Sequence, residues 1–246
     1  MNSVLKVDGL FGGYSKKPVI HDINFELQKG EIIGLIGLNG AGKSTIIKHL
    51  IGLMEPQKGS ISILGNKIEE NIENYRKNFA YIPEMPILYE ELTLVEHLQF
   101  IAMSYGIDEK TFNERVSWLL KEFKMEKRKD WFPVHFSKGM KQKVMIMSAF
   151  LVNPPLYIID EPFLGLDPLG IHSLLELLNK AREDGSTIFM STHILATAEK
   201  YCDRFIILHN GRIKMMGTLK EIREKAGMAA SSLDEIYLAI TKDEIE

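Results

Sequence analysis

The residues from 37 to 45 have the types and the spacing of a loop that binds phosphate: Gly37, Leu38, Asn39, Gly40, Ala41, Gly42, Lys43, Ser44 and Thr45. Glycines let backbone N–H groups turn toward phosphate oxygens, the lysine can reach the β- and γ-phosphates, and the serine hydroxyl can bind Mg²⁺. An apolar run at 31–36 precedes the loop and a helical pattern at 44–53 follows it. The alternative, a glycine-rich turn that happens to end in Lys-Ser, requires neither. The pattern therefore predicts binding of ATP with Mg²⁺.

Two carboxylates follow the apolar run at 156–159. Asp160, at the end of a buried strand, could bind the water shell of Mg²⁺ beside Ser44. Glu161 could polarise a water molecule as the general base of ATP hydrolysis. Taken alone, the pair is explained as well by an acidic edge of a sheet. Together with the phosphate loop, it favours a catalytic role.

Ser137 stands before an apolar helical pattern and is a good helix N-cap. The backbone amides after it would give an electropositive helix end that faces outward. Taken alone, this segment is better explained as an ordinary capped helix start. Only the other motifs in the chain favour a functional role for this segment.

Hydrophobic periodicity predicts an α/β protein with helices inserted in its middle. Strands are expected at 20–27, 31–36, 156–159, 187–190 and 205–208, and helices at 44–53, 171–182 and 195–201. We expect a helical block near 86–150, with capping boxes at 93–96 and 111–114 and a break at 105–108. From about residue 228, the chain has the pattern of a short amphipathic tail with an acidic end.

The composition is that of a globular protein, since 45% of the 246 residues are hydrophobic, 26% are charged and the formal net charge is −3. Proteins that bind nucleic acid are more often basic, so no nucleic-acid partner is expected. Cys202 is the only cysteine, which favours a reducing compartment. The N-terminus lacks a signal-peptide pattern, and the apolar run 144–152 is too short to span a bilayer. A membrane role would depend on a partner.

The order of the motifs resembles that of a known family. The phosphate loop, the Ser-x-Gly segment at 137–139, the Asp-Glu pair, the Gly-Leu-Asp-Pro segment at 165–168 and the Ser-Thr-His segment at 191–193 are similar to those of ATP-binding-cassette (ABC) ATPases. The resemblance covers nearly the whole chain. It implies a P-loop NTPase (RecA-like) α/β core with an N-terminal antiparallel β subdomain and an inserted α-helical subdomain. We accordingly expect an ABC ATPase domain at 1–227, with the helical subdomain at about 86–150, and a short helical tail at 228–246.

The resemblance also implies that part of each ATP site comes from a second copy of the chain. In a head-to-tail homodimer, Ser137, Lys138 and Gly139 would complete the site in trans, opposite the partner's phosphate loop. The family usually has glycine where Lys138 stands. This lysine could attract phosphate or point to solvent, and we expect the second. Asp167 would carry communication across the dimer.

Three more positions take their expected roles from the resemblance. Tyr14 falls where the family places an aromatic ring that stacks on adenine; the alternative is a surface tyrosine in a loop. His193 would contact the γ-phosphate and Glu161. Glu84 stands where the family usually has a glutamine that reaches Mg²⁺ and couples to the membrane subunit. A carboxylate could keep the metal contact, but it adds negative charge near phosphate.

The stretches 81–84, 135–143 and 163–168 resemble the ATPase subunits of Ecs-type transporters. This narrower resemblance implies an ATPase at the cytoplasmic face of the cell membrane, bound to an EcsB-like integral membrane permease through helical residues near 86–135, and a role in export or secretion. The alternative is a soluble ABC ATPase that acts on nucleic acid or the ribosome, although the sequence lacks the coiled coil, zinc modules or second cassette of those proteins. A small-molecule kinase would have no need of the segments at 137–139 and 191–193.

Overall fold

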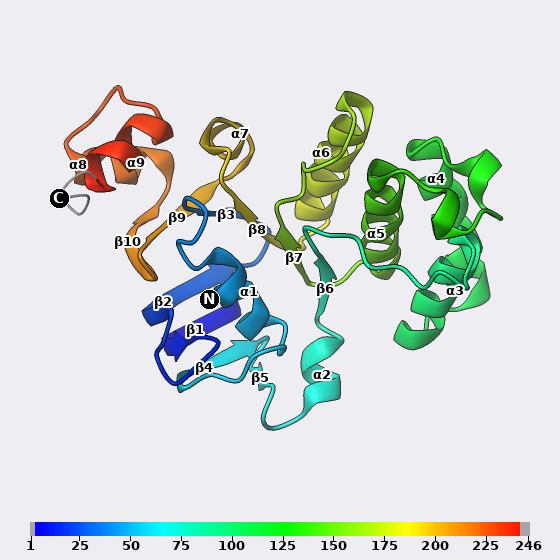
Figure 1. The fold of residues 1–246 in the computed structure, drawn as a ribbon, viewed down its shortest axis with the longest axis horizontal. Helices are drawn as coiled ribbons and strands as arrows, with labels where there is room; N and C mark the ends of the chain where they lie inside the picture. The colour runs from blue at the N-terminus through cyan, green and yellow to red at the C-terminus, as the bar shows by residue number, and fades with distance from the viewer. Residues whose placement is uncertain (1–2, 242–246) are drawn as a thin grey trace.

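The computed structural model describes residues 3–241 and contains two β-sheets (Figure 1). The smaller sheet is antiparallel, with the strand order β2-β1-β4-β5. Its strands are β1 (Ser3–Gly12), β2 (Ile20–Gln28), β4 (Lys58–Ile63) and β5 (Asn66–Lys67). This is the N-terminal antiparallel sheet that the family resemblance implies, and β2 matches the strand expected at 20–27.

The larger sheet has the order β10-β9-β3-β8-β7-β6, in which β10 is antiparallel to β9 and the other pairs are parallel. Its strands are β3 (Ile32–Ile36), β6 (Phe79–Ile82), β7 (Leu156–Asp160), β8 (Thr187–Thr192), β9 (Arg204–His209) and β10 (Arg212–Gly217). Every residue of β3, β7 and β8 is buried, as in parallel sheets that are covered on both faces. The four strands expected in this region are present.

The carboxyl ends of β3, β7 and β8 meet at one edge of the larger sheet. Ile36 pairs with Thr192 between β3 and β8, and Asp160 pairs with Ser191 between β7 and β8. The phosphate loop follows β3, Asp160 ends β7, and His193 follows β8. The parallel register therefore brings motifs that lie far apart in the sequence to one place.

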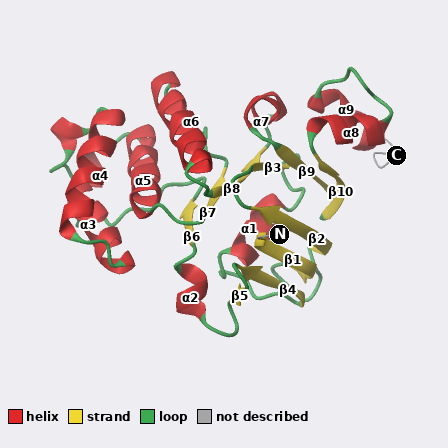
Figure 2. Ribbon diagram, turned by 180° about the vertical axis from the view of Figure 1, so that it is seen from behind, coloured by secondary structure: helices red, strands yellow, loops and turns green. Residues whose placement is uncertain are grey.

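Helices lie over the middle of the larger sheet, between the two sheets and at both ends of the larger sheet (Figure 2). They are α1 (Lys43–Leu50), α2 (Ile72–Arg76), α3 (Leu94–Tyr105), α4 (Glu109–Glu122), α5 (Lys138–Val152), α6 (Pro168–Glu183), α7 (Leu195–Tyr201), α8 (Leu219–Ala226), α9 (Leu233–Thr241) and two short 3₁₀ helices at 126–128 and 133–135. The helices α3, α4 and α5 lie beyond β6 and β7, and α8 and α9 lie at the opposite end beside β10. The helices expected from the sequence at 44–53, 171–182 and 195–201 correspond to α1, α6 and α7.

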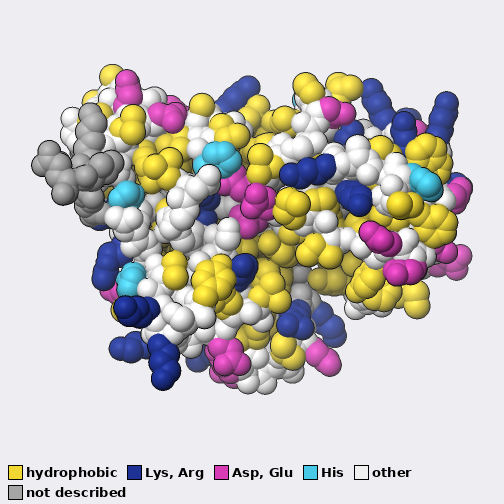
Figure 3. Space-filling model, viewed as in Figure 1, with side chains coloured by type: hydrophobic (Ala, Val, Ile, Leu, Met, Phe, Trp, Pro, Cys, Tyr) yellow, Lys and Arg dark blue, Asp and Glu magenta, His cyan; other side chains and the backbone are white. Residues whose placement is uncertain are grey.

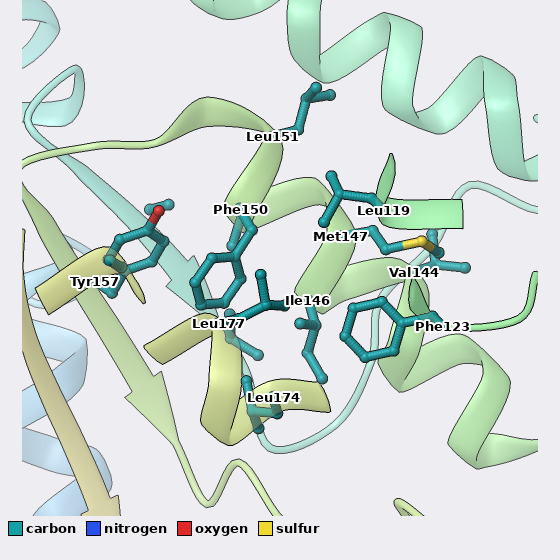
Figure 4. Close-up of a cluster of buried hydrophobic side chains, with 14 of the residues drawn as sticks. Leu119, Phe123, Val144, Ile146, Met147, Phe150, Leu151, Tyr157, Leu174 and Leu177 are labelled. Atoms are coloured by element: carbon teal, nitrogen blue, oxygen red, sulfur yellow. The ribbon is translucent and has the colours of Figure 1, made fainter. Parts of the chain in front are cut away.

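A cluster of buried side chains from α4, α5, α6 and β7 joins the helical end of the molecule to the sheet (Figure 4). The ring of Phe150 on α5 stacks on Tyr157 of β7, with ring centroids 4.6 Å apart. Leu177 of α6 packs in the same cluster. Because this packing is shared, it fixes α5, and Ser137 at its start, relative to Asp160 at the end of β7.

The first predicted capping box is confirmed and the second is wrong. At the start of α3, the Thr93 hydroxyl accepts from the Glu96 N–H, and the Glu96 carboxylate accepts from the Thr93 N–H. The N-cap of α4 is Asp108, whose carboxylate accepts from the Thr111 N–H at 2.9 Å. Aspartate caps a helix at least as well as threonine, so α4 begins at the earlier of two possible caps. Gly106, with φ of 67°, ends α3 at the predicted break.

The C-terminal part of the described chain is helical, with α8 and α9 packed against α7 and the strands β3 and β9. The acidic end expected at 242–246 lies outside the described residues. Within residues 3–241, no helix is both long enough and apolar enough to cross a membrane.

Candidate functional site

A cavity of about 490 Å³ lies where β3, β7 and β8 end, a size within the usual range of ligand pockets. Its walls are formed by Tyr14, Val19, Asn39, Gly40, Gly42, Lys43, Ser44, Thr45, Glu84, Glu161, Leu164 and His193. Gly37, Leu38 and Ala41 of the predicted loop lie outside the lining. A larger cavity of about 730 Å³ lies between α4 and α6, away from the phosphate loop. Chemistry rather than size therefore identifies the site.

The backbone of the phosphate loop requires its glycines. Gly40 and Gly42 have φ of 84° and 109°, a region that residues with a Cβ atom rarely adopt. Position 37 has no room for a side chain, because a Cβ atom there would lie 2.6 Å from the carbonyl oxygen of Leu208. Gly42 is also the N-cap of α1, so the electropositive end of this helix begins at the cavity.

Lys43, Glu161 and His193 form a cluster of charged and titratable groups. Lys43 and Glu161 are 6% and 7% exposed. The Lys43 ammonium donates to the carbonyl oxygen of Gly37 at 2.7 Å and lies 3.5 Å from Glu161 Oε1. His193 Nδ1 lies 2.9 Å from the same Oε1, without the angle of a hydrogen bond, and the His193 N–H donates to Oε2 at 3.4 Å. The carboxylate of Glu161 is thus held from two sides.

Asp160 is 5% exposed and lies beside the same cluster. Its carboxylate accepts a hydrogen bond from the Ser191 hydroxyl. Burial raises the pKa of Asp160, while hydrogen bonds from Ser191 and Ser44 and the charge of Lys43 oppose that shift. The Ser191 hydroxyl also accepts from the Glu161 N–H at 3.2 Å. One serine therefore orients both acidic residues.

The oxygen groups at this edge of the sheet suit a hard cation. The Ser44 hydroxyl is close enough to the Asp160 carboxylate to oppose the rise of its pKa. Mg²⁺ usually takes one or two protein carboxylates together with water and substrate phosphates, so a single buried carboxylate beside a hydroxyl fits it. Across the described residues 3–241, no group of three or more His, Cys, Asp and Glu side chains could hold a metal by itself.

Tyr14 and Glu84 stand at the rim of the cavity. Tyr14 is 65% exposed, and its hydroxyl accepts from the Lys48 ammonium at 3.1 Å. This hydrogen bond is the main reason why the pKa of Tyr14 is lowered. Glu84 is exposed, and the carbonyl oxygen of the preceding residue, Pro83, accepts from the buried Gln142 amide at 3.3 Å. This hydrogen bond links the rim of the cavity to α5.

Besides Gly37, Leu38 and Ala41, the predicted site residues outside the lining of this cavity are Asp160, Ser137, Lys138, Gly139 and Asp167. Ser137 is the exposed N-cap of α5, and its hydroxyl accepts from the Met140 N–H at 3.2 Å. Lys138 is exposed, as expected. A Cβ atom on Gly139 would lie 2.5 Å from the carbonyl oxygen of Gly165, so the two segments are in close contact.

Asp167 connects α6 to α5. Its carboxylate accepts from the Gly170 N–H at 2.7 Å, which makes it the N-cap of α6, and from the Lys143 ammonium at 3.2 Å. The hydrogen bond from Gly170 is the main reason why the pKa of Asp167 is lowered. Asp167 and Ser137 therefore belong to one connected surface.

Sequence reasoning missed four residues that form or support the site. Val19 and Leu164 line the cavity, Ser191 orients the two acidic residues, and the Tyr237 hydroxyl accepts from the Leu38 N–H at 3.1 Å. A signal existed for Ser191, because a hydroxyl at the end of a buried strand, beside a strand that ends in Asp-Glu, is well placed to bond them. Nothing in the neighbouring sequence marks the other three.

The comparisons with known proteins place the chain in a family. The model of the family described as "ABC transporter" matches residues 20–164, so the chain belongs to the ABC transporter family. It is 60% identical over 242 residues to the "ABC-type transporter ATP-binding protein EcsA" of Bacillus subtilis (strain 168), covering 98% of each chain. It is 35% identical to the "SkfA peptide export ATP-binding protein SkfE" of the same organism, covering 91% of this chain and 92% of the relative.

Solved structures agree with this assignment. A "Structure of ATP binding subunit of ABC transporter" superposes with a TM-score of 0.95 at 59% identity, covering 97% of this chain and 99% of that one. A dimeric ATP-binding cassette, MJ0796, bound to ADP and phosphate, shares the fold with a TM-score of 0.78 at 24% identity, over 87% of this chain and 98% of that one. The predicted ABC ATPase fold and family are therefore confirmed.

The chain is the ATP-binding subunit of an ABC transporter, and it couples ATP hydrolysis to transport. The solved MJ0796 cassette, which shares the fold, is a dimer. The alternative of a soluble ABC ATPase that acts on nucleic acid or the ribosome is not favoured, because the similar proteins are transporter subunits.

Proposed function

We propose that this subunit drives export through an Ecs-type transporter, working at the cytoplasmic face of the cell membrane with an EcsB-like permease. The similarity to EcsA over nearly the whole of both chains supports the transporter type. The names of more distant relatives support the direction, since one serves export of the SkfA peptide and another serves export of Nod factor. The observation that carries the ATPase role is the single cavity lined by Lys43, Ser44, Glu161 and His193.

Within this cavity, each residue has a role that follows from its chemistry. Lys43 would bind the β- and γ-phosphates, and the loop amides would cradle them. Ser44, Asp160 and Glu84 would hold Mg²⁺, which when bound neutralises phosphate charge. Tyr14 would stack on adenine from the rim, where its ring is exposed.

Glu161 is placed to act as the general base. Its buried carboxylate lies between Lys43 and His193, and it would accept a proton from the water that attacks the γ-phosphate. His193 would contact both the Glu161 carboxylate and the γ-phosphate and keep them aligned. The positive φ of Glu161, 48°, supports a constrained position for this side chain.

The second half of the site would come from a partner copy in a head-to-tail homodimer. Ser137, Lys138 and Gly139 begin α5 at the surface, where the helix N-terminus can bind the γ-phosphate of an ATP molecule held by the other copy. Asp167 is connected to this surface through Lys143. It would couple the two ATP sites of the dimer, so that nucleotide binding at one affects the other. Closure of the dimer on ATP would then power transport.

The permease would dock on the helical part of the chain. Large apolar side chains are exposed there, including Ile87, Met103 and Val134 at 78%, 80% and 68%. Figure 3 shows hydrophobic side chains gathered on this face over α3. An exposed apolar group of this kind is typical of an interaction surface. It lies within the predicted docking region near residues 86–135.

The same arrangement supports the expected domain boundaries. We propose an ABC ATPase domain at 1–227 with an inserted helical subdomain at about 86–150, and a short helical tail at 228–246. The helices α3 and α4 fall within that insertion, α5 begins in it and ends two residues past it at Val152, and α9 falls within the tail.

The replacement Glu161→Gln tests the ATPase role. It keeps the shape of the side chain but cannot accept the proton, so we expect turnover to fall about 100-fold or more, with ATP still bound and the dimer more stable. Steady-state phosphate release and size-exclusion chromatography with ATP measure both effects. Glu31→Gln is the matched control, because it removes a partly buried carboxylate that pairs with Arg204 away from the cavity. Near-normal turnover of Glu161→Gln would exclude Glu161 as the base.

The transporter type is tested by isolating the chain from detergent-solubilised membranes. We expect it to be recovered with an integral membrane protein. Recovery with ribosomes or DNA, and without a membrane protein, would contradict the proposal.

A further inference from the structure

Tyr237 brings the C-terminal helix α9 into contact with the phosphate loop. The side chain is 2% exposed, and its hydroxyl accepts from the Leu38 N–H at 3.1 Å. The helix itself is well anchored, since Leu233 and Ile236 are fully buried. Glu199 of α7 accepts from the Leu233 N–H at 2.8 Å. A buried hydroxyl on an anchored helix is a fixed point for the loop.

The hydrogen bond from Leu38 belongs to the peptide group that also holds Lys43. The carbonyl oxygen of Gly37 and the N–H of Leu38 are the two ends of one planar trans peptide, so they point in opposite directions. The N–H end donates to Tyr237, and the carbonyl end accepts from the Lys43 ammonium at 2.7 Å. Any rotation of this peptide would break both hydrogen bonds together.

The side chains of Gly37 and Leu38 do not hold this peptide; the next carbonyl oxygen along the chain, that of Leu38, accepts from the Ala41 N–H at 3.1 Å. Gly37 has no side chain, and the Leu38 side chain is 54% exposed, so neither packs the peptide in place. An ammonium group has three donors. Lys43 can therefore keep its hydrogen bond to Gly37 and still donate to phosphate oxygens, provided that the carbonyl stays where it is.

We infer that Tyr237 is a positioning residue for ATP binding: by fixing the Gly37–Leu38 peptide, it holds the Lys43 ammonium in the direction of the phosphates. The inference rests on the proposed role of Lys43. It makes the C-terminal tail part of the nucleotide site, although none of the tail residues that the structure describes, 228–241, lines the cavity.

Tyr237→Phe in the full-length chain tests this inference, because it removes the hydroxyl and keeps the buried ring. We expect the dissociation constant for ATP with Mg²⁺ to rise about fivefold, the effect of losing one hydrogen bond. Tyr75→Phe is the matched control. The Tyr75 side chain is fully buried, and its hydroxyl donates to the Leu50 carbonyl oxygen at 2.6 Å, at the opposite end of α1. It should leave ATP affinity unchanged.

Titration with a fluorescent ATP analogue measures affinity, and thermal unfolding without nucleotide confirms that each variant is folded at the assay temperature. An ATP affinity of Tyr237→Phe within twofold of the parent, in a folded protein, overturns the inference. An equal loss in Tyr75→Phe overturns it as well, because the effect would then be one of general stability.

A double-mutant cycle with Lys43→Ala separates this inference from the proposed function. Lys43→Ala alone should weaken ATP binding at least tenfold, since it removes a charged donor. Adding Tyr237→Phe to Lys43→Ala should change affinity less than twofold, because the group that Tyr237 positions is already absent. A further fivefold loss in that background would show that Tyr237 does not act through Lys43. If Lys43→Ala binds ATP normally, the proposed role of the phosphate loop fails instead.

Discussion

The phosphate-loop half of the site and the half that begins at Ser137 are built in different ways. In the first half, Lys43, Asp160 and Glu161 are nearly inaccessible to water and contact one another or Ser191. In the second half, Ser137 is exposed, and its side chain bonds the first turn of its own helix. One half is assembled within a single chain, and the other is a surface.

The difference follows from the cost of burying charge. Buried carboxylates and ammonium groups must be paired, so the chain must fold completely before the first half exists. The open N–H groups of a helix start can remain hydrated at the surface until a phosphate replaces the water. We therefore expect changes in the first half to act on ATP binding by one chain or, at Glu161, on hydrolysis, and changes in the second half to leave ATP binding by one chain unaltered.

The largest expected effect comes from mixing inactive variants. Lys43→Ala and Ser137→Arg should each be inactive, but a mixed dimer has one intact site, formed by the loop of one copy and the Ser137 segment of the other. With equal amounts, about a quarter of the sites are restored, because half of the dimers are mixed. Phosphate release from the mixture should rise accordingly.

The control for that experiment is a mixture of Lys43→Ala with Glu161→Gln. Both changes fall in the phosphate-loop half, so every site in every dimer stays damaged and no activity should return. Equal recovery in the two mixtures, or none in either, would contradict a site shared between copies.

A smaller effect is expected from two glycines that are packed against carbonyl oxygens. In Gly37→Ala the new Cβ atom would lie 2.6 Å from Leu208 O, and in Gly139→Ala 2.5 Å from Gly165 O. Each change should lower the free energy of unfolding by about 1–3 kcal/mol, as overpacking does. We expect Gly37→Ala alone to weaken ATP binding to the isolated chain, and Gly139→Ala to reduce turnover only. Urea unfolding and ATP titration measure these effects, and the reverse assignment would contradict the comparison.

The smallest expected effect is that of Glu84→Gln, at the rim between the two halves. Because Glu84 would help to hold Mg²⁺, removing its charge should weaken binding of ATP with Mg²⁺ about twofold, the scale of exposed charge interactions. The loss should shrink at high salt, because salt screens exposed charges. Glu91→Gln, an exposed carboxylate outside the cavity lining, is the control. Tighter ATP binding by Glu84→Gln would contradict the metal-binding role and show instead that the carboxylate repels phosphate.

Local patterns in the sequence predicted much of the fold and many of the residues that could act chemically. The apolar runs before the phosphate loop and before Asp160 are buried strands because a covered parallel strand must be apolar throughout. The strands β1, β4 and β10 were not identified individually, since each is only partly buried and its pattern is mixed. The capping box predicted at 111–114 is wrong because Asp108 caps the start of this helix instead.

The sequence by itself determined which groups could act, because the glycines, the lysine and the carboxylates are recognised by type and spacing. Only the tertiary structure decided which of them meet. Ser191 reaches Asp160 because of strand register, and Tyr237 reaches Leu38 because α9 packs beside the end of β3. The separation of Ser137 from the cavity was likewise decided by the packing of α5 against β7. Contacts of this kind depend on register and packing between distant segments, and the residues beside each contact do not determine either.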